Sequence, residues 1–309
     1  MKALRFLPIV ILLNFCTPPT EEQPTSPLQV EKLEPTTFNA YWKNGGAEIT
    51  SYELEQARYG EIHKGKAVTI FVTEPFSKSK QVKLDDYKAA GDDRVNVMKL
   101  NMTKKFLTGI YPYSMMLSTF TPLDYSPMIK ATTSSQEWCG HTFMQLNLQD
   151  AGYQWAGYSY FESEGDGKGV VENLLTEDEL WTKLRLDPTQ LPVGEIELLP
   201  STFYLRLRHQ EVAPQKATAT LSVLKASAFA LEEHSAYVLD YGNRKLTIHF
   251  ESGTPNRILG WEETHMSGFG KAEELTTKAK RINTIRSKYW GKNANADREI
   301  REQLGLGVE

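Results

Sequence analysis

Apolar and polar residues alternate with a period of two in several stretches of the chain. Such alternation is typical of β-strands that have one face on a core and the other in water. The pattern places Tyr204, Arg206 and Arg208 together on the polar face of one such strand. The clearest examples are FYLRLRH (203–209), KLTIHFE (245–251) and TFMQLNLQ (142–149).

Further strands are predicted where apolar, β-branched and aromatic residues lie between turn signals. The turn signals are YGEIHKGK (59–66), EGDGKG (164–169) and DYGNRK (240–245). The additional strands predicted in this way are Ile49–Gln56, Ala67–Thr73, Asn96–Met102, Leu107–Phe120, Tyr153–Glu162 and Thr218–Leu224.

Few helices are expected. Thr176 and Glu179 form a capping box, which predicts a short helix that continues to about Leu186. A second helix is predicted near residues 296–304, with Gly305 as its C-terminal stop. Strands and helices do not alternate regularly, so a doubly wound nucleotide-binding fold is not expected.

The pattern therefore predicts a mainly β protein with a few short helices. About ten antiparallel strands do not remain one flat sheet, and they either curl or split into two packed sheets. We expect a large curved antiparallel sheet in the form of a half-barrel, a barrel or a sandwich. A curled sheet with an apolar concave face would have room for a lipid, whereas a sandwich would fill that space with side chains.

The amino terminus indicates export. In MKALRFLPIVILLNFC, an apolar run from Phe6 to Leu13 follows two basic residues and precedes Cys16. The run is too short to span a bilayer and has the length of a signal-peptide core. A cysteine at this place is typical of bacterial lipoproteins, in which it is acylated, although the bulky Phe15 stands where a small residue is usual. Secretion with cleavage elsewhere is the alternative.

Composition divides the rest of the chain. Residues 17–37 are rich in Pro, Thr and Glu and are predicted to form a tether after the 1–16 signal segment. Residues 38–309 are predicted to form a single β-rich domain.

A formal charge of −4 gives no reason to expect a nucleic acid partner, and with two cysteines in all no zinc motif is expected. No metal and no cofactor are predicted.

The segment EWCGHT (137–142) contains Cys139, the only cysteine after Cys16. It begins like a disulfide-exchange loop, but Thr142 stands where the second cysteine belongs, so dithiol exchange is not expected. If a strand extended back through Cys139, its thiol and the imidazole of His141 would share a face and form a minimal Cys–His pair. The alternative is a small structural residue in a strand.

Ligand-facing side chains are expected on two segments. The aromatic residues of AGYQWAGYSYF and the two arginines of FYLRLRH would line a groove or grip an anion. A core ladder for the aromatic residues and cross-strand ion pairs for the arginines are the alternatives. The candidates are Tyr153, Trp155, Tyr158, Tyr160, Arg206 and Arg208.

Two charged stretches have weaker functional interpretations. Glu162, Glu164 and Asp166 alternate as at the start of a calcium loop, but Asn173 stands where the twelfth-position Glu is required, so a solvated hairpin tip is favoured. The stretch TTKAKRINTIRSKYWGK (276–292) contains six basic residues and no acid. It would attract an anionic membrane surface, although a solvated strand or loop is favoured.

Three stretches resemble a group of uncharacterised bacterial envelope lipoproteins, some of which are labelled septum formation inhibitor Maf. They are residues 41–77, SSQEWCGHTFMQLN (134–147) and a tail that begins GWEETHMSGFGK (260–271); the resemblance covers most of residues 38–306. Maf proteins themselves are cytoplasmic nucleotide pyrophosphatases with an α/β fold and an N-terminal Ser-Pro-Arg motif, which this chain lacks after its signal segment. The resemblance implies an envelope location and supplies no catalytic residues.

The sequence thus favours a lipid-anchored envelope protein that binds an apolar ligand or a protein partner without chemistry. Its partners would be the membrane, through Cys16, and that ligand or protein. The alternatives are an envelope hydrolase or transferase that uses Cys139 and His141, and a structural surface lipoprotein.

Overall fold

The computed structural model describes residues 35–307. The predicted signal segment with Cys16 and residues 17–34 of the predicted tether lie outside this range, whereas the last three residues of that tether, 35–37, are helical. The helices are α1 (Pro35–Trp42), α2 (Glu177–Leu186), α3 (Thr202–Arg208) and α4 (Glu299–Gln303). The strands are β1 (Ala47–Arg58), β2 (Glu61–Ser77), β3 (Arg94–Thr108), β4 (Tyr111–Pro122), β5 (Lys130–Glu137), β6 (Gly140–Gln149), β7 (Gly152–Tyr158), β8 (Gly167–Val171), β9 (Leu175–Thr176), β10 (Gly194–Leu199), β11 (Gln215–Leu224), β12 (His234–Asp240), β13 (Arg244–Phe250), β14 (Ile258–Ser267) and β15 (Glu273–Ser287).

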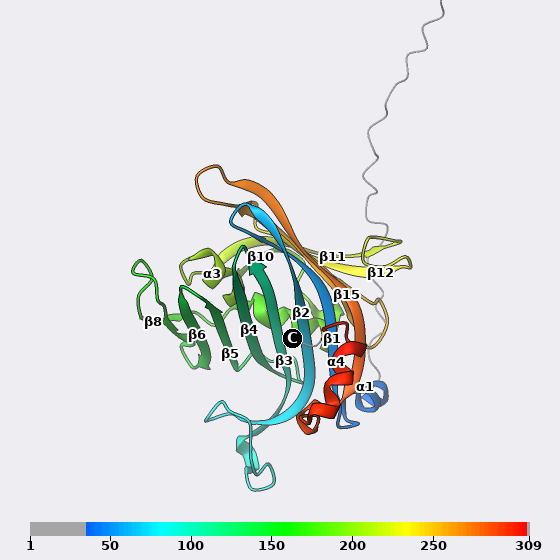
Figure 1. Ribbon diagram of the computed structural model, residues 1–309. Helices are drawn as coiled ribbons and strands as arrows, with labels where there is room; N and C mark the ends of the chain where they lie inside the picture. The colour runs from blue at the N-terminus through cyan, green and yellow to red at the C-terminus, as the bar shows by residue number, and fades with distance from the viewer. Residues whose placement is uncertain (1–34, 308–309) are drawn as a thin grey trace, which may run out of the picture.

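All fifteen strands belong to one large, curved and unclosed sheet, as predicted (Figure 1). The sheet runs from β8 through β7 and down to β1, continues with β15, and then descends to β9. Every neighbouring pair is antiparallel except β9 and β10. The two edge strands, β8 and β9, are consecutive in the sequence, so the chain crosses the open seam between the ends of the sheet.

Helix α2 fills the space that the sheet encloses. The Oγ1 of Thr176 accepts a hydrogen bond from the Glu179 amide while the Glu179 carboxylate accepts one from the Thr176 amide, which is the predicted capping box. All ten residues of α2 are buried, so the helix is covered on every side. Its apolar residues Leu180, Trp181 and Leu184 belong to the same core as residues of β1–β4 and β10–β14.

The segment FYLRLRH is helical, so the prediction of a strand there was wrong. It forms α3, whose first turn is capped by the Ser201 hydroxyl and by the carboxylate of Asp178 from α2. Tyr204 and Arg208 are four residues apart on a helix and share a face, whereas Arg206 points in another direction. The common polar face predicted for these three residues does not exist.

Two other predicted strands have bounds that differ from those expected. The stretch 107–120 is divided by a turn at residues 109–110, where Gly109 adopts a φ of +57°. Strand β7 ends at Tyr158 instead of Glu162. Near the C-terminus, the predicted helix is present as a short 3-10 turn (Asn295–Arg298) followed by α4, and Gly305 follows with a φ of +62°.

Because neighbouring strands are antiparallel, each connection between strands lies at one of the two ends of the sheet. One end, called the hairpin end below, carries the turns 59–60, 109–110, 138–139, 159–166, 241–243 and 268–272, together with α3. The opposite end, called the base, carries the connections 78–93, 123–129, 150–151, 225–233 and 251–257. Helix α2 enters at the hairpin end, and its last turn reaches the base, where Arg185 meets Glu48 at the start of β1.

Candidate functional site

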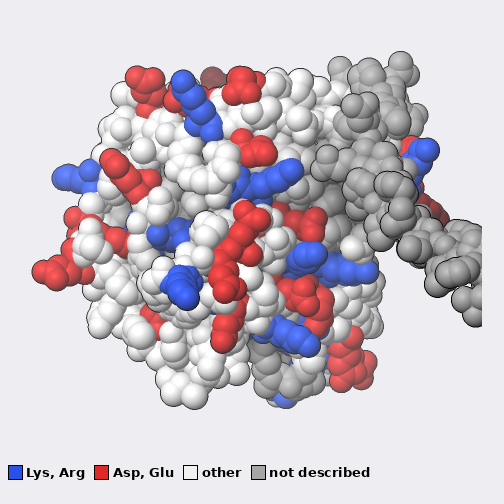
Figure 2. Space-filling view, turned by 90° about the horizontal axis from the view of Figure 1, so that it is seen from above, with Lys and Arg blue, Asp and Glu red and all other residues white. Residues whose placement is uncertain are grey.

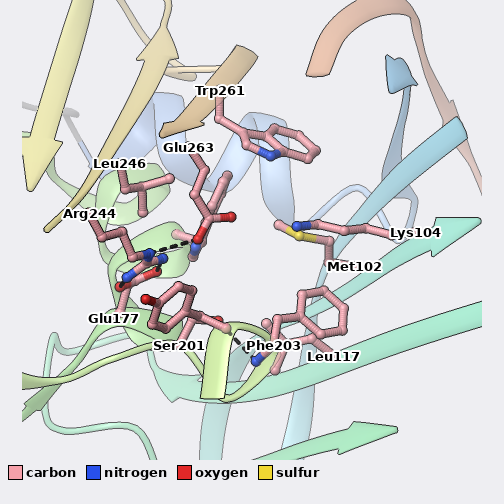
Figure 3. A pocket seen from close by; sticks show the side chains of 12 residues that line it. Met102, Lys104, Leu117, Glu177, Ser201, Phe203, Arg244, Leu246, Trp261 and Glu263 are labelled. Carbon is pink, nitrogen blue, oxygen red and sulfur yellow. Dashed lines mark hydrogen bonds and ion pairs between the residues drawn. The ribbon is translucent and has the colours of Figure 1, made fainter. Parts of the chain in front are cut away.

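The interior contains a network of buried charges around the first turn of α2. Arg244 of β13 donates two hydrogen bonds to Glu177, at 2.6 and 2.7 Å, and one to Glu263 of β14, at 2.7 Å (Figure 3). All three side chains are at least nine-tenths buried. Burial alone would raise the pKa of Glu263, but Arg244 and Lys104 outweigh it and hold that pKa at about 2.

Lys104 of β3 approaches the same network from the other side (Figure 3). Its ammonium group lies 5.2 Å from the centre of the Phe203 ring and 5.9 Å from that of Trp261. Within residues 35–307 the structure gives this ammonium no hydrogen bond or ion pair. Burial lowers its pKa, against the opposing effect of Glu263.

The cavity between these side chains is too small for a ligand. Its volume is about 20 Å³, which suits a single water molecule. Met102, Leu117 and Trp261 close it on the apolar side. The interior is therefore filled by α2 and by paired charges, and it offers no open groove for a lipid.

The sheet does form an open pocket at the hairpin end, beside α3. This α3 pocket has a volume of about 370 Å³, within the range of small-molecule sites. The turn 159–166, the end of β7, the start of β8 and the residues that follow α3 enclose it. Its lining side chains include Trp155, Glu164, Arg206, His209, Gln210 and Glu211.

An ion-paired cluster forms the floor of the α3 pocket. Glu164 accepts hydrogen bonds from Arg206 Nη1, at 2.9 Å, and from His209 Nδ1 and the Ser159 hydroxyl. Burial would raise the pKa of Glu164, but the hydrogen bonds from Ser159 and His209 and the charge of Arg206 outweigh it, so this pKa lies below its usual value. The cluster thus places an ionised carboxylate beside a guanidinium.

The ion pair with Glu164 does not use every donor of the Arg206 guanidinium. Its side chain is 7% exposed, and its Nε has no hydrogen-bond partner among the described residues. A buried N–H without a partner costs free energy, and a ligand acceptor or a water molecule would recover it. This unsatisfied donor distinguishes the α3 pocket from a wider hollow of about 560 Å³ at the base, where the side-chain amide of Gln81 is already bonded to Leu148 and Asn147.

Glycines allow the indole of Trp155 to form a wall of this pocket. A Cβ atom at Gly169 of β8 would lie 2.7 Å from its Nε1, and one at Gly167 would lie 3.0 Å from the ring. Any side chain at either position would therefore collide with the indole or displace it. His209 adopts a left-handed conformation (φ 54°) at the end of α3, which turns its ring onto Glu164 and against Phe161.

The structure brings only two of the predicted ligand-facing residues together. Trp155 and Arg206 both line the α3 pocket. Tyr153 is fully buried and donates a hydrogen bond to the carbonyl of Met128, so it is a core residue. The remaining three candidates, Tyr158, Tyr160 and Arg208, are at least partly exposed outside this pocket.

Cys139 and His141 are not aligned on one strand, as the predicted pair requires. Cys139 lies in the two-residue turn between β5 and β6, so the strand does not extend back through it. Its thiol is exposed, and the Glu137 carboxylate, through a hydrogen bond and its charge, raises the thiol pKa. A raised pKa leaves less thiolate and a weaker nucleophile. His141 is exposed and lies opposite Gln136 in the ladder.

The two weaker sequence candidates are also placed. Glu162, Glu164 and Asp166 all lie in the turn 159–166, and Glu164 is engaged by Arg206 and His209. In residues 35–307 no group of acidic, histidine or cysteine side chains is arranged to hold a metal ion. The basic stretch lies mostly on β15, where Lys278 pairs with Glu262 and Arg281 with Glu251.

Sequence reasoning missed most of the charged groups, although β3 and β14 contained a signal. Lys104 lies on the same inward face of β3 as Met102 and Phe106. Glu263 lies on the same inward face of β14 as Trp261. A charged residue in the inward register of an amphipathic strand marks a buried charge. No comparable signal pointed to His209, whose role depends on the turn 159–166.

The chain matches no protein-family model, no curated protein and no solved structure. Over the described part of the chain, no helix is long and apolar enough to cross a membrane.

Proposed function

We propose that this chain is a lipid-anchored protein of the cell envelope that binds a ligand without chemistry, and that the ligand occupies the α3 pocket. The observation that carries the proposal is an open pocket lined by both Trp155 and Arg206, whose buried Nε has no partner among the described residues. The signal-like amino terminus with Cys16 supports the envelope location.

The lining of the pocket favours a small polar ligand with one flat apolar face, as a sugar ring has. Arg206, Gln210 and Glu211 supply donors and acceptors, and the indole of Trp155 supplies an aromatic wall. The filled interior weighs against a lipid held inside the sheet. We therefore propose a polar ligand in place of the apolar one that the sequence favours.

The electrostatics of the pocket favour binding over catalysis. Arg206 and His209 hold Glu164 in its ionised form, and a carboxylate with a lowered pKa is a poor proton acceptor and a poor acid near neutral pH. The unactivated Cys139 supports the same conclusion for the hydrolase or transferase alternative.

Saturation-transfer NMR with glucose, galactose, N-acetylglucosamine and maltose tests this proposal on the full chain. At least one saccharide should show transfer that is lost in Arg206→Lys, which keeps the charge but not the guanidinium fork, and in Trp155→Leu. Arg208→Ala, on the same helix but outside the pocket, is the matched control and should bind as the wild type does. Absence of transfer from all four sugars, or transfer that survives both pocket variants, would refute the saccharide site.

A further inference from the structure

The hairpin end exposes large apolar side chains at the tips of separate turns. Ile110 and Phe269 are 79% and 80% exposed, and Trp138 and Tyr160 are 69% and 63% exposed. Each of these four residues lies in a different turn of the hairpin end. Leu231, Val193 and Trp290 are exposed elsewhere, but four such tips at one end of the sheet indicate an interaction surface.

Two of these tips border the β1–β2 hairpin in the strand order. The turns 109–110 and 268–272 flank the turn 59–60 in the strand order, and Tyr59 stacks on Phe269 with ring centres 5.6 Å apart. The β1–β2 and β14–β15 hairpins project together at the top of the molecule (Figure 1). Ile110 and Phe269 have no acidic residue within two positions in the sequence.

We propose that the hairpin end rests on a phospholipid surface and inserts these tips, defined as Ile110, Trp138, Tyr160 and Phe269, into its interfacial layer. Separate protruding tips suit a fluid, which needs no shape complementarity, better than they suit a folded partner. Trp and Tyr are the residues that favour the membrane–water interface.

Charge does not drive this contact. Seen from above, the hairpin end shows acidic and basic side chains of both signs scattered among uncharged ones (Figure 2). Insertion of apolar tips is therefore the source of affinity, and a neutral phospholipid surface is sufficient. Binding should depend little on salt, unlike attraction to an anionic surface.

The tether has the length that this orientation needs. Helix α1 precedes β1 at the base, the end of the sheet away from the inserted tips. The 18 residues from 17 to 34 span at most about 60 Å when extended, and the 17-residue strand β2 spans about 56 Å. A lipid on Cys16 would therefore reach the plane of the hairpin tips. The inference rests on the proposed lipid anchor only at this step.

Cys139 supplies a probe at the surface in question, beside Trp138. The full chain with Cys16→Ser, labelled at Cys139 with an NBD fluorophore, should show a blue shift on phosphatidylcholine vesicles and quenching by brominated phosphatidylcholine. The double substitution Ile110→Ser and Phe269→Ser should lower the affinity for the vesicles about tenfold or more. The control is a label at Leu231→Cys in a chain with Cys16→Ser and Cys139→Ser, because Leu231 is 93% exposed at the base.

The leader is present in every variant, so adsorption through it affects both label positions alike. A shift at position 139 but not at 231, insensitive to salt, supports the inference. No shift at 139, or equal shifts at both positions, would overturn it. A shift that appears without vesicles as the protein concentration rises would identify self-association instead and would also overturn it. None of these outcomes depends on the ligand of the α3 pocket.

Discussion

The interior around α2 and the pocket beside α3 both contain an arginine paired with glutamate, but the two regions differ in access to solvent. In the interior, Arg244 uses three of its donors on Glu177 and Glu263, and the remaining space suits one water molecule. In the α3 pocket, Arg206 pairs with Glu164 and lines a cavity of about 370 Å³, and its buried Nε has no partner among the described residues. The same pair of residue types is therefore enclosed in one place and borders an open pocket in the other.

This difference separates stability from binding. Buried charges that lose a partner are costly because the remaining charge is held away from water. A charged side chain beside an open pocket is nearer to solvent, so the loss of its partner should cost less free energy. Substitutions in the interior should therefore destabilise the protein without a specific effect on binding. Substitutions in the pocket should weaken binding with a smaller effect on stability.

The largest effect is expected for Arg244→Met. The substitution leaves Glu177 and Glu263 buried without their shared cation, and it should lower the free energy of unfolding by about 3–5 kcal/mol. Urea denaturation at neutral pH would measure it. Arg257→Met is the matched control, because Arg257 is 40% exposed and pairs with Glu251; its cost should be about 1 kcal/mol or less. Equal costs for both variants would remove the distinction between the regions.

The sequence predicted the architecture through local signals. The period-two alternation of β6 and β13 reflects one face on the core, and the capping box of α2 is complete within four residues. These features were readable because the interactions that cause them lie within the strand or the first helical turn.

Helix α3 shows where local reasoning failed. Phe203, Leu205 and Leu207 are all buried, although alternate residues of a helix point in different directions. The helix is enclosed on most sides, so its sequence lacks a 3.6-residue polar stripe, and its amino terminus is capped by Asp178 from another helix. A period of two was therefore a misleading signal, because a tertiary contact determined the structure.

The sequence predicted only part of the α3 pocket, for the same reason. Trp155 and Arg206 were candidates, but Arg206 was assigned to a strand face that does not exist. The pocket depends on the turn 159–166, which carries Glu164 from one end of the sheet onto a helix some 40 residues later. A sequence contains no periodicity that reports such a contact.

The second largest effect concerns Asp178, whose carboxylate is buried in α2 beside Thr202. Burial raises its pKa from 3.8 to about 6, so the folded chain binds a proton more tightly than the unfolded chain between these values. The contribution of Asp178 to stability should therefore fall by about 3 kcal/mol as the pH rises from about 4 to about 6, and then level off.

Asp178→Asn removes this titration. Relative to the wild type, the variant should gain about 3 kcal/mol between pH 4 and pH 7, whatever constant offset the amide introduces at pH 4. Urea denaturation of both proteins at a series of pH values would measure the change. A difference that stays constant with pH would show that Asp178 is solvated like a surface carboxylate, and it would weaken the contrast between the interior and the pocket.

The smallest effect on stability is expected for Glu164→Gln in the α3 pocket. The variant loses the charge that pairs with Arg206 and His209, but its amide oxygen can still accept one hydrogen bond from Arg206, so the free energy of unfolding should fall by about 2 kcal/mol, less than for Arg244→Met. Saccharide binding should fall much further, because Arg206 loses the partner that fixes its orientation. Denaturation and saturation-transfer NMR on the same variant would measure the two effects. A loss of stability comparable to that of Arg244→Met, with binding unchanged, would mean that the Glu164–Arg206 pair is a second structural clamp and that the ligand lies elsewhere.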